Sequence, residues 1–244
     1  MGQAVVTGGA SGIGLATAKA LSARDWQVTI LDIDVAAGER AAKAGGFRFL
    51  RCDMGDVDAI EAVFKTIGPV ELLVNNAGIS GPTLSVLDMP VAEWKKVLDV
   101  NLTGMFVASK CVLPAMIAGK HGIIINMSSI SAKHGHAFRS PYGTTKRGIL
   151  GFTAALAREV GEYNIRVNAI LPGPVAGERA DRVMAARAET LGISLAEMTQ
   201  RTASNLALRR FVQPEEIADA VVFLASDSAR AITQEFLSVD AGAN

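Results

Sequence analysis

A glycine-rich turn at residues 7–14 constrains the fold most, because it reads Thr-Gly-Gly-Ala-Ser-Gly-Ile-Gly between two regular segments. The apolar run at residues 4–6 predicts a strand, and residues 15–21 predict a helix. Residues without a Cβ allow a tight turn and a close approach to the backbone. The N-terminus of the following helix offers N–H groups and a positive dipole end. Such a strand, turn and helix predict a pyrophosphate site, although an ordinary tight turn would have the same sequence.

An acidic residue, Asp32, ends the next predicted strand at residues 27–31, about 20 residues beyond the turn. A carboxylate at this place accepts hydrogen bonds from both hydroxyls of an adenosine ribose and repels a 2′-phosphate. No basic residue stands at Ser11 or Ile33, where it could hold that phosphate. The sequence therefore predicts NAD as the cofactor, not NADP. A solvated acid at a strand end is the alternative.

Strands and helices alternate along the remaining chain. Apolar runs predict strands at residues 47–52, 71–74, 122–127, 165–171 and 236–239. Helices are predicted at residues 91–101 and 103–118, from Tyr142 to about Glu162, and at residues 213–224. This alternation predicts an α/β fold with a parallel, doubly wound sheet of about seven strands.

Polar residues and glycines follow several of these strands. Asp53 and Met54 follow the third, residues 75–78 (Asn-Asn-Ala-Gly) the fourth, Ser128 and Ser129 the fifth, and Pro172 and Gly173 the sixth. In an open α/β sheet the ligand crevice lies at the carboxyl ends of the strands, so we expect one composite site. Asp53 could instead cap the helix that starts near Asp56, and the two amides could tie neighbouring strand ends together.

Three residues stand out within the predicted helices. Asn101 lies between two of them, where it either breaks the helix or exposes a carbonyl that another group uses. Tyr142 and Lys146 are four residues apart and therefore share one helical face. Without the other motifs, Tyr142 and Lys146 could simply be two side chains on a helix that covers the sheet, each with its apolar part on the protein and its polar end in solvent.

Together these residues resemble the short-chain dehydrogenase/reductase family. The resemblance covers essentially the whole chain and rests on residues 7–14, residues 75–78, Asn101, Ser129, Tyr142-x-x-x-Lys146 and Pro172-Gly173, in the family's order and spacing. It implies a single domain over residues 1–244 with a Rossmann fold, strand order 3-2-1-4-5-6-7, helices on both faces and NAD as cofactor.

The resemblance also implies the catalytic roles. Tyr142 is the expected general acid/base, and because a free phenol has a pKa of about 10, the charge of Lys146 is expected to lower it. Lys146 is also expected to hold the nicotinamide ribose, and Ser129 to bind the substrate oxygen. Ser128 is the rival of Ser129, but the spacing from Ser129 to Tyr142 fits the family. Asn101 is expected to leave a main-chain carbonyl free for a water linked to Lys146.

The cofactor site expected from the resemblance draws on most of these segments. Its members are Gly8, Ser11, Gly12, Ile13, Gly14, Asp32, Ile33, Asp53, Met54, Asn76, Ala77, Gly78, Tyr142, Lys146, Pro172, Gly173 and Val175. One departure is Gly177, which stands where the family often has a threonine that contacts the nicotinamide amide. Main-chain groups near Val175 are expected to hold that amide instead.

The substrate is expected to meet residues 131–140 and a long connection at about residues 174–212, which predicts a lid. With Ser129 and Tyr142, the candidate substrate residues are His134, Arg139 and Arg179, unless these charges are solvated at the rim. We expect hydride transfer between NAD and a secondary alcohol or ketone on a small polar substrate: a polyol, a sugar or an anionic hydroxy compound. A 3-oxoacyl reductase and a non-catalytic NAD-binding sensor or scaffold are the alternatives.

Composition limits the partners. Lys+Arg and Asp+Glu both number 24, which argues against nucleic acid and an anionic membrane surface. No apolar run approaches the ~20 residues of a membrane span.

The first strand begins almost at Met1, so we expect no signal peptide. The two cysteines, Cys52 and Cys111, are expected to be buried free thiols in a reducing cytoplasm. No metal site is expected. Helices at residues 104–118 and 148–157 carry few charges, which predicts a homotetramer, or a dimer.

Overall fold

The computed structural model describes residues 2–243, apart from the side chains of Arg179 and Thr190. Its sheet consists of β1 (Gln3–Thr7), β2 (Gln27–Asp32), β3 (Arg48–Arg51), β4 (Leu72–Asn75), β5 (Gly122–Met127), β6 (Ile165–Pro172) and β7 (Phe236–Val239). The α-helices are α1 (Gly12–Ser22), α2 (Val35–Gly45), α3 (Val57–Phe64), α4 (Val91–Leu98), α5 (Gly104–Gly119), α6 (Ser140–Val160), α7 (Glu178–Leu191), α8 (Leu195–Ser204) and α9 (Pro214–Ala225).

The strand order is β3-β2-β1-β4-β5-β6-β7, and every neighbouring pair is parallel. This confirms the predicted doubly wound parallel sheet and its order. The order reverses direction between β1 and β4, where Val6 pairs with Ile30 on one side and with Val74 on the other. A ligand crevice is expected at this switch point.

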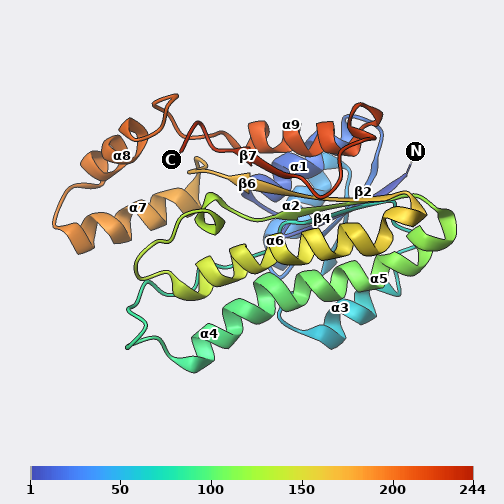
Figure 1. Cartoon of the computed structure of the whole chain (residues 1–244), viewed down its shortest axis with the longest axis horizontal. Coiled ribbons are helices and arrows are strands. Elements are labelled where there is room, and N and C mark those ends of the chain that lie inside the picture. The colour runs from blue at the N-terminus through green and yellow to red at the C-terminus, as the bar shows by residue number, and fades with distance from the viewer. Residues whose placement is uncertain (1, 244) are drawn as a thin grey trace.

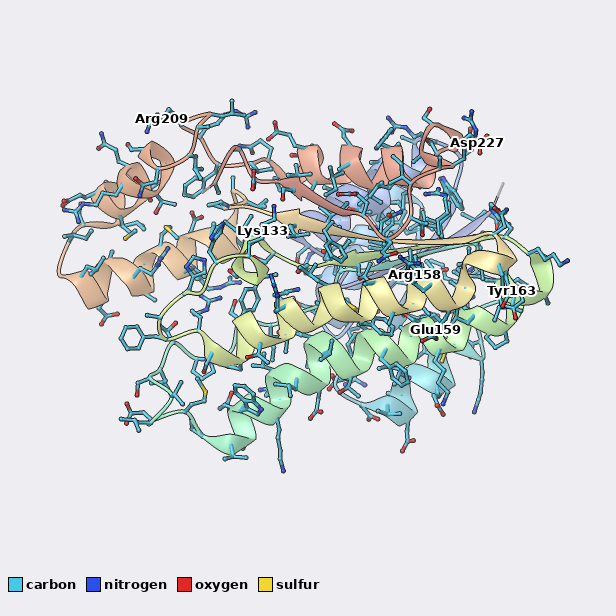
Figure 2. The ribbon with its side chains drawn as sticks, viewed as in Figure 1. Lys133, Arg158, Glu159, Tyr163, Arg209 and Asp227 are labelled. Atoms are coloured by element: carbon cyan, nitrogen blue, oxygen red, sulfur yellow. The ribbon has the colours of Figure 1, made fainter. Side chains whose placement is uncertain are left out.

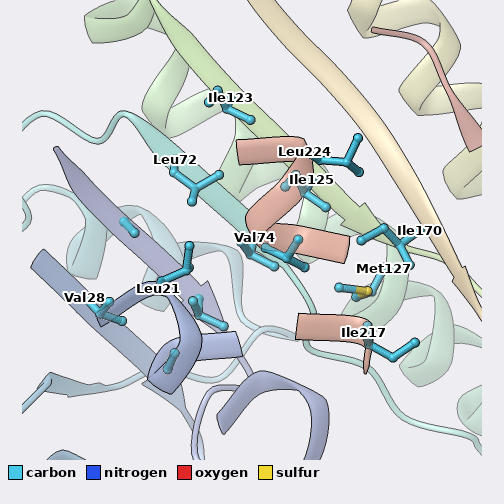
Figure 3. Close-up of a cluster of buried hydrophobic side chains, with 14 of the residues drawn as sticks. Leu21, Val28, Leu72, Val74, Ile123, Ile125, Met127, Ile170, Ile217 and Leu224 are labelled. Carbon is cyan, nitrogen blue, oxygen red and sulfur yellow. The ribbon is translucent and has the colours of Figure 1, made fainter. Parts of the chain in front are cut away.

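Helices cover both faces of the sheet (Figure 1). On one face α1 and α9 pack against alternate strand residues, including Leu72, Val74, Ile125 and Ile170 (Figure 3). On the other face α3, α5 and α6 bury the intervening strand residues, such as Leu73 and Ile124. Because successive strand side chains point to opposite faces, a strand buried on both sides must be apolar throughout, as these strands nearly are.

The long connection after β6 is built from α7 and α8, which project beyond one end of the sheet (Figure 1). Met184, Ala188 and Met198 pack between the two helices. The segment starts and ends at one place, because Val175 and Val212 form a parallel bridge, with Ala176 N–H donating to the Val212 carbonyl at 2.8 Å. The chain therefore enters and leaves the helical pair at neighbouring positions that are hydrogen-bonded to each other.

The helix break predicted at Asn101 is wrong. One helix runs from Val91–Gly119 through a π-helical turn, η1 (Asp99–Thr103), that contains Asn101. A π-turn adds a residue without ending the helix. This helix also corrects the expectation that no segment approaches membrane-spanning length: by length and composition it is long and apolar enough. One such helix is weak evidence, because a core helix of a soluble protein passes the same test.

Cys52 and Cys111 are free thiols. Cys52 is buried, as expected, but Cys111 is only half-buried. Cys111 lies on α5, whose outer face is turned away from the sheet, and the sequence pattern alone did not separate the two faces of this apolar helix.

Candidate functional site

The glycine turn is closed by close backbone contact. A Cβ on Gly14 would collide with the Gly8 carbonyl oxygen, and one on Gly8 would lie 2.9 Å from the Ala77 Cα. Gly8 and Gly12 have φ angles of 62° and 50°, which favour glycine. Gly12 is exposed, and a Cβ there would meet nothing within 4 Å. The turn is thus packed tightly on its inner side and open on its outer side.

The amides at residues 75 and 76 do tie strand ends together. The Asn76 amide donates to the carbonyl oxygens of Thr7 and Gly8, both at 3.0 Å, and so holds the glycine turn against β4. Asn75 donates to Asn126 on β5 at 2.9 Å and to Ser109 on α5 at 3.1 Å. Thr7 belongs to the predicted turn motif, but the role of its hydroxyl was not predicted: it accepts hydrogen bonds from the main-chain N–H groups of Asn76 and Ala77.

Asp32 lies beside the turn, at the end of β2. Its carboxylate accepts hydrogen bonds from the main-chain N–H groups of Ala10 at 3.0 Å and Asp34 at 3.1 Å. The neighbouring Ile33 is 55% exposed. The carboxylate is therefore oriented by two backbone donors at the place where a ribose would approach.

Asp53 does not cap the next helix. Its carboxylate accepts from the Gly55 N–H at 2.8 Å, while Asp56 caps α3 by accepting from Ala59 N–H. The side chain of Met54 is buried, and its carbonyl oxygen lies so close to Gly104 that no Cβ fits there. This close approach fixes the loop after β3 against the start of α5.

Asn101 is fully buried and joins three parts of the site. Its Oδ1 accepts from the Ile79 N–H at 2.7 Å, and its Nδ2 donates to the Ile79 carbonyl at 2.9 Å and to the Thr145 hydroxyl at 3.1 Å. The Thr145 hydroxyl in turn donates to the Tyr142 carbonyl at 2.9 Å. Asn101 thus fixes the loop after β4 to the helix that carries Tyr142. Its main-chain carbonyl as a water site stays a prediction.

The two serines after β5 have different surroundings. Ser128 is buried, and its hydroxyl donates to the Lys146 carbonyl at 2.7 Å, which is a structural bond between β5 and α6. Ser129 accepts from the Ser131 N–H at 3.1 Å through its Oγ. Because this bond uses the oxygen as acceptor, the Ser129 hydroxyl proton can be donated to a substrate oxygen. The geometry therefore favours Ser129 over Ser128.

Lys146 is buried, 4% exposed, and its ammonium donates to the Met127 carbonyl at 2.7 Å. Its Nζ lies 5.6 Å from the centre of the Tyr142 ring and 3.6 Å from the position that a Cβ on Gly78 would occupy. The carbonyl at the end of β5 and the glycine after β4 therefore set the position of the ammonium. Tyr142 and Lys146 do share one helical face, as their spacing predicts.

Pro172 and Gly173 lie at the end of β6 beside β7, and a Cβ on Gly173 would lie 2.7 Å from the Asp240 Cα. In the bridge to Val212, the neighbours of Val175 make the cross-strand bonds. The N–H and carbonyl of Val175 itself therefore point to the opposite side. Gly177, which precedes α7, has a φ of 125°, a conformation that a threonine would adopt only with strain.

The candidate substrate residues fall into two groups. His134 and His136 are exposed on the loop before α6, and Arg139 is half-buried at the end of that loop, with its guanidinium carbon 4.9 Å from the centre of the Tyr142 ring. Burial lowers the pKa of His136, and the charges of Arg187 on α7, of Arg139 and of His134 lower it further. The side chain of Arg179 lies outside the described residues.

A cavity of about 630 Å³ lies between this loop and the first turns of α6, and Lys133, labelled in Figure 2, is among the residues that line it. Its described lining includes Thr144 and Arg147 but not Ser129, Tyr142 or Lys146. Arg147 donates to the Ala132 carbonyl at 2.8 Å, and Lys133 to the Ser238 hydroxyl at 2.7 Å. His134, His136 and Arg139 also line the cavity, so it belongs to the side of the site where the candidate substrate residues lie.

The described residues fit a nicotinamide dinucleotide. The outer side of the turn is open at Gly12, and Ser11 makes no capping hydrogen bond at the N-terminus of α1, which leaves this end for an anion. Asp32 is oriented for a ribose, and Lys146 lies further along the same edge. Carboxylate at β2, glycine turn at β1 and buried lysine near the end of β5 thus follow one another along the carboxyl ends of the strands.

Comparison with known proteins agrees with this arrangement. A family model described as "Enoyl-(Acyl carrier protein) reductase" matches residues 8–244. The cis-4-hydroxycyclohexanecarboxylate dehydrogenase of Sinomonas cyclohexanicum is 37% identical over 98% of this chain and 95% of the relative. A 3-oxoacyl-[acyl-carrier-protein] reductase of a Synechocystis strain is 33% identical over 98% of this chain and 95% of its own length.

Solved structures superpose closely. An actinorhodin polyketide ketoreductase with NADPH has a TM-score of 0.95 at 33% identity, covering 99% of this chain and 96% of that one. An NAD⁺-bound xylitol dehydrogenase has a TM-score of 0.91 at 30% identity, and the match covers 99% of this chain and 98% of the xylitol dehydrogenase chain. With the glycine turn, Asn101, Ser129, Tyr142 and Lys146 in place, the chain belongs to the short-chain dehydrogenase/reductase family of oxidoreductases.

Proposed function

We propose that this chain interconverts a secondary alcohol and a ketone on a small polar substrate, with NAD as cofactor. The observation that carries the proposal is the buried Lys146 ammonium, held by the Met127 carbonyl 5.6 Å from the Tyr142 ring. A cation at this distance favours the ionised phenol. Tyr142 then takes the proton of an alcohol, or returns it to a ketone, while Ser129 holds the substrate oxygen.

When bound, NAD supplies the hydride acceptor. The chain's own contribution is position and charge: the glycine turn and α1 hold the pyrophosphate, Asp32 the adenosine ribose, and Lys146 the nicotinamide ribose. The outward N–H and carbonyl of Val175 are suited to bind the nicotinamide carboxamide. They would take over the contact that a threonine often makes in this family, at the position that Gly177 occupies here. This set orients the substrate carbon towards the nicotinamide and the substrate oxygen towards Tyr142.

The preference for NAD is supported by Asp32, whose carboxylate would repel a 2′-phosphate. Relatives of known structure include one with NADPH and one with NAD⁺, so this chain's choice needs its own test. The cofactor preference is decided by steady-state rates with NAD and with NADP, followed by the absorbance of the reduced nicotinamide. A kcat/KM at least about tenfold higher with NAD supports the proposal, and a preference for NADP overturns it.

We propose an anionic substrate group near His134, His136, Arg139 and Arg187. Arg139 contacts the Tyr142 ring, and Arg187 of α7 is near enough to the loop before α6 for its charge to help lower the pKa of His136. The name of the Sinomonas relative describes action on a hydroxy acid. A polyol or sugar without charge is the second member of the same polar class.

Paired substrates test the charge. Arg187→Gln should raise KM for 4-hydroxycyclohexanecarboxylate several-fold and leave KM for 4-methylcyclohexanol unchanged. Arg182→Gln is the matched control on the same helix, because its side chain is 73% exposed beside Glu178. An equal effect of Arg187→Gln on both substrates would overturn the anionic assignment.

A 3-oxoacyl reductase is the second candidate, because such enzymes are among the relatives. Turnover of a 3-oxoacyl thioester at a higher kcat/KM than any alcohol or simple ketone would favour it. The third candidate, a non-catalytic sensor, requires NAD binding without turnover of any compound. NAD binding measured by fluorescence, next to a turnover panel for the wild type and Tyr142→Phe, separates these outcomes.

We further propose a homotetramer in a reducing, cytoplasmic compartment. Phe106 on α5 is 50% exposed and makes an edge-to-face contact, 6.1 Å between ring centres, with the half-buried Phe152 on α6. Gly151 and Ala155 lie exposed on the same helix as Phe152, so small and apolar residues share this part of the outer surface. Light scattering should give four times the chain mass for the wild type and a smaller species for Phe106→Asp. A monomeric wild type contradicts this proposal.

A further inference from the structure

Arg139 is the residue immediately before α6, and its position is fixed from two sides. Its carbonyl accepts from the Gly143 N–H at 2.9 Å, which ties its backbone to the first turn of the helix. Its side chain is half-buried, with the guanidinium carbon 4.9 Å from the centre of the Tyr142 ring. Lys146 is 5.6 Å from the same centre. The ring of Tyr142 therefore has two cations against it.

The two cations differ in kind. A guanidinium is charged at every pH that an enzyme meets, and its flat, weakly hydrated surface packs well on an aromatic ring. An ammonium can lose its proton when buried, and Lys146 is buried. Because a phenolate spreads its charge into the ring, a cation near the ring stabilises the ionised form more than the neutral form. Arg139 thus acts on the phenol whatever the protonation of Lys146.

The charged neighbours act in the same direction. His134, His136 and Arg187 are grouped with Arg139 at this end of the site. Asn101 and Thr145, which join η1 to α6, and Ser128 and Ser129 at the end of β5 are uncharged. Arg187 is positively charged at every pH of interest, whereas the lowered pKa of His136 leaves that imidazole neutral where a phenol titrates.

We propose that Arg139 is a positioning residue that, together with Lys146, lowers the pKa of the Tyr142 phenol and orients its ring. The proposal rests on the proposed role of Tyr142 as acid/base. A charge within about 6 Å shifts a pKa by one to three units, and a half-buried charge lies at the lower end of that range. Removing the charge of Arg139 should therefore raise the pKa of Tyr142 by about one unit.

Tyrosinate absorbance reads this pKa without any turnover. The chain has two tyrosines, Tyr142 and Tyr163, and Tyr163 lies at the far end of α6 (Figure 2). In a Tyr163→Phe background, the ultraviolet titration therefore reports Tyr142 alone. Arg139→Met should move the midpoint up by about one unit, and Arg139→Lys should restore at least half of that shift.

A midpoint in Arg139→Met within about 0.3 units of the background overturns the proposal, as does an Arg139→Lys variant no closer to the background than Arg139→Met. Melting curves establish that each variant is folded at the titration temperature. If Arg139→Met does not fold, Arg139→Gln takes its place under the same criteria. If neither neutral variant folds, Arg139→Lys decides: a midpoint shift larger than about one unit overturns the proposal, because that variant keeps the charge.

The pH dependence of kcat/KM gives the functional readout. With a neutral substrate, Arg139→Met should shift the acid limb of alcohol oxidation up by about one unit. An unshifted limb with a raised KM for anionic substrates alone would show that Arg139 only binds substrate, and would overturn the proposal. If the wild type turns over no substrate, the proposed function fails, and the tyrosinate titration still decides the role of Arg139.

Discussion

Asn101→Ala should lower both stability and activity, because one buried amide joins three segments of the site. It removes the two bonds to Ile79 and the bond to Thr145, at 2.7, 2.9 and 3.1 Å. Each such bond contributes about 1 kcal/mol net, so the three together contribute about 3 kcal/mol. Thr145 keeps its bond to the Tyr142 carbonyl, and Ile79 is only half-buried, so water can replace part of the loss.

We therefore expect a loss of about 2–4 kcal/mol in the free energy of unfolding. For a chain of 244 residues, 1 kcal/mol corresponds to about 2–4 °C in Tm, which gives a fall of roughly 5–15 °C. The released loop lies next to Gly78 and Lys146, so kcat should fall more than KM rises. Denaturant unfolding, melting curves and steady-state rates measure these quantities.

The matched control is Asn205→Ala, which removes the same atoms from an exposed residue at the end of α8. It should change Tm by less than about 2 °C. A change in Asn101→Ala as small as in the control would refute the reasoning. Loss of activity at unchanged stability would also refute it, because the side-chain bonds would then not hold the segment in place.

Four further outcomes follow from other residues. Gly14→Ala should abolish NAD binding and lower stability by about 2 kcal/mol, because its Cβ collides with the Gly8 carbonyl, whereas Gly119→Ala has open space and should be neutral; calorimetric titration and melting curves compare them. Hydrogen bonds from Arg210 and from the Gln213 N–H lower the pKa of Glu216 from 4.5 to about 2, so its contribution to stability is complete above about pH 4.5 and lost as the pH falls to about 2; the Tm difference between wild type and Glu216→Gln should shrink over that window. Burial raises the pKa of Cys52 to about 11 and also raises the pKa of the half-buried Cys111, so iodoacetamide should label Cys111 first and Cys52 only after unfolding, as peptide mass mapping would show. Gly177→Thr should lower stability by about 1–3 kcal/mol because of its φ of 125°, and unchanged melting would contradict the assigned strain.

The sheet was largely predictable from local pattern. The apolar runs at β5 and β7 match the observed strands end to end, and the ends of the others differ from the observed ends by at most one residue. Parallel strands buried on both faces are continuous apolar runs, so their positions are visible in the sequence. The glycine turn was also predictable, because its conformation requires residues without a Cβ.

Long-range contacts were not predictable. The π-turn at Asn101 forms around bonds to Ile79, which lies 22 residues earlier, and no local pattern shows them. The assignment of Ser128 as structural depends on its bond to the Lys146 carbonyl. Arg139 was expected at the substrate, and its contact with the Tyr142 ring depends on how the loop before α6 turns. The direction of a side chain in a loop is set by tertiary packing, and the spacing of residues along the sequence does not predict it.

The bridge between Val175 and Val212 has an evolutionary consequence. Residues 206–208, after α8, are in addition bonded to residues 241–243 after β7, so the part that can be exchanged as a cassette is the helical pair itself. Grafting residues 177–204 from a relative with another specificity should leave the sheet and the cofactor cleft unchanged. Families built this way can acquire new substrates by altering an appendage while the framework that performs the chemistry is inherited intact.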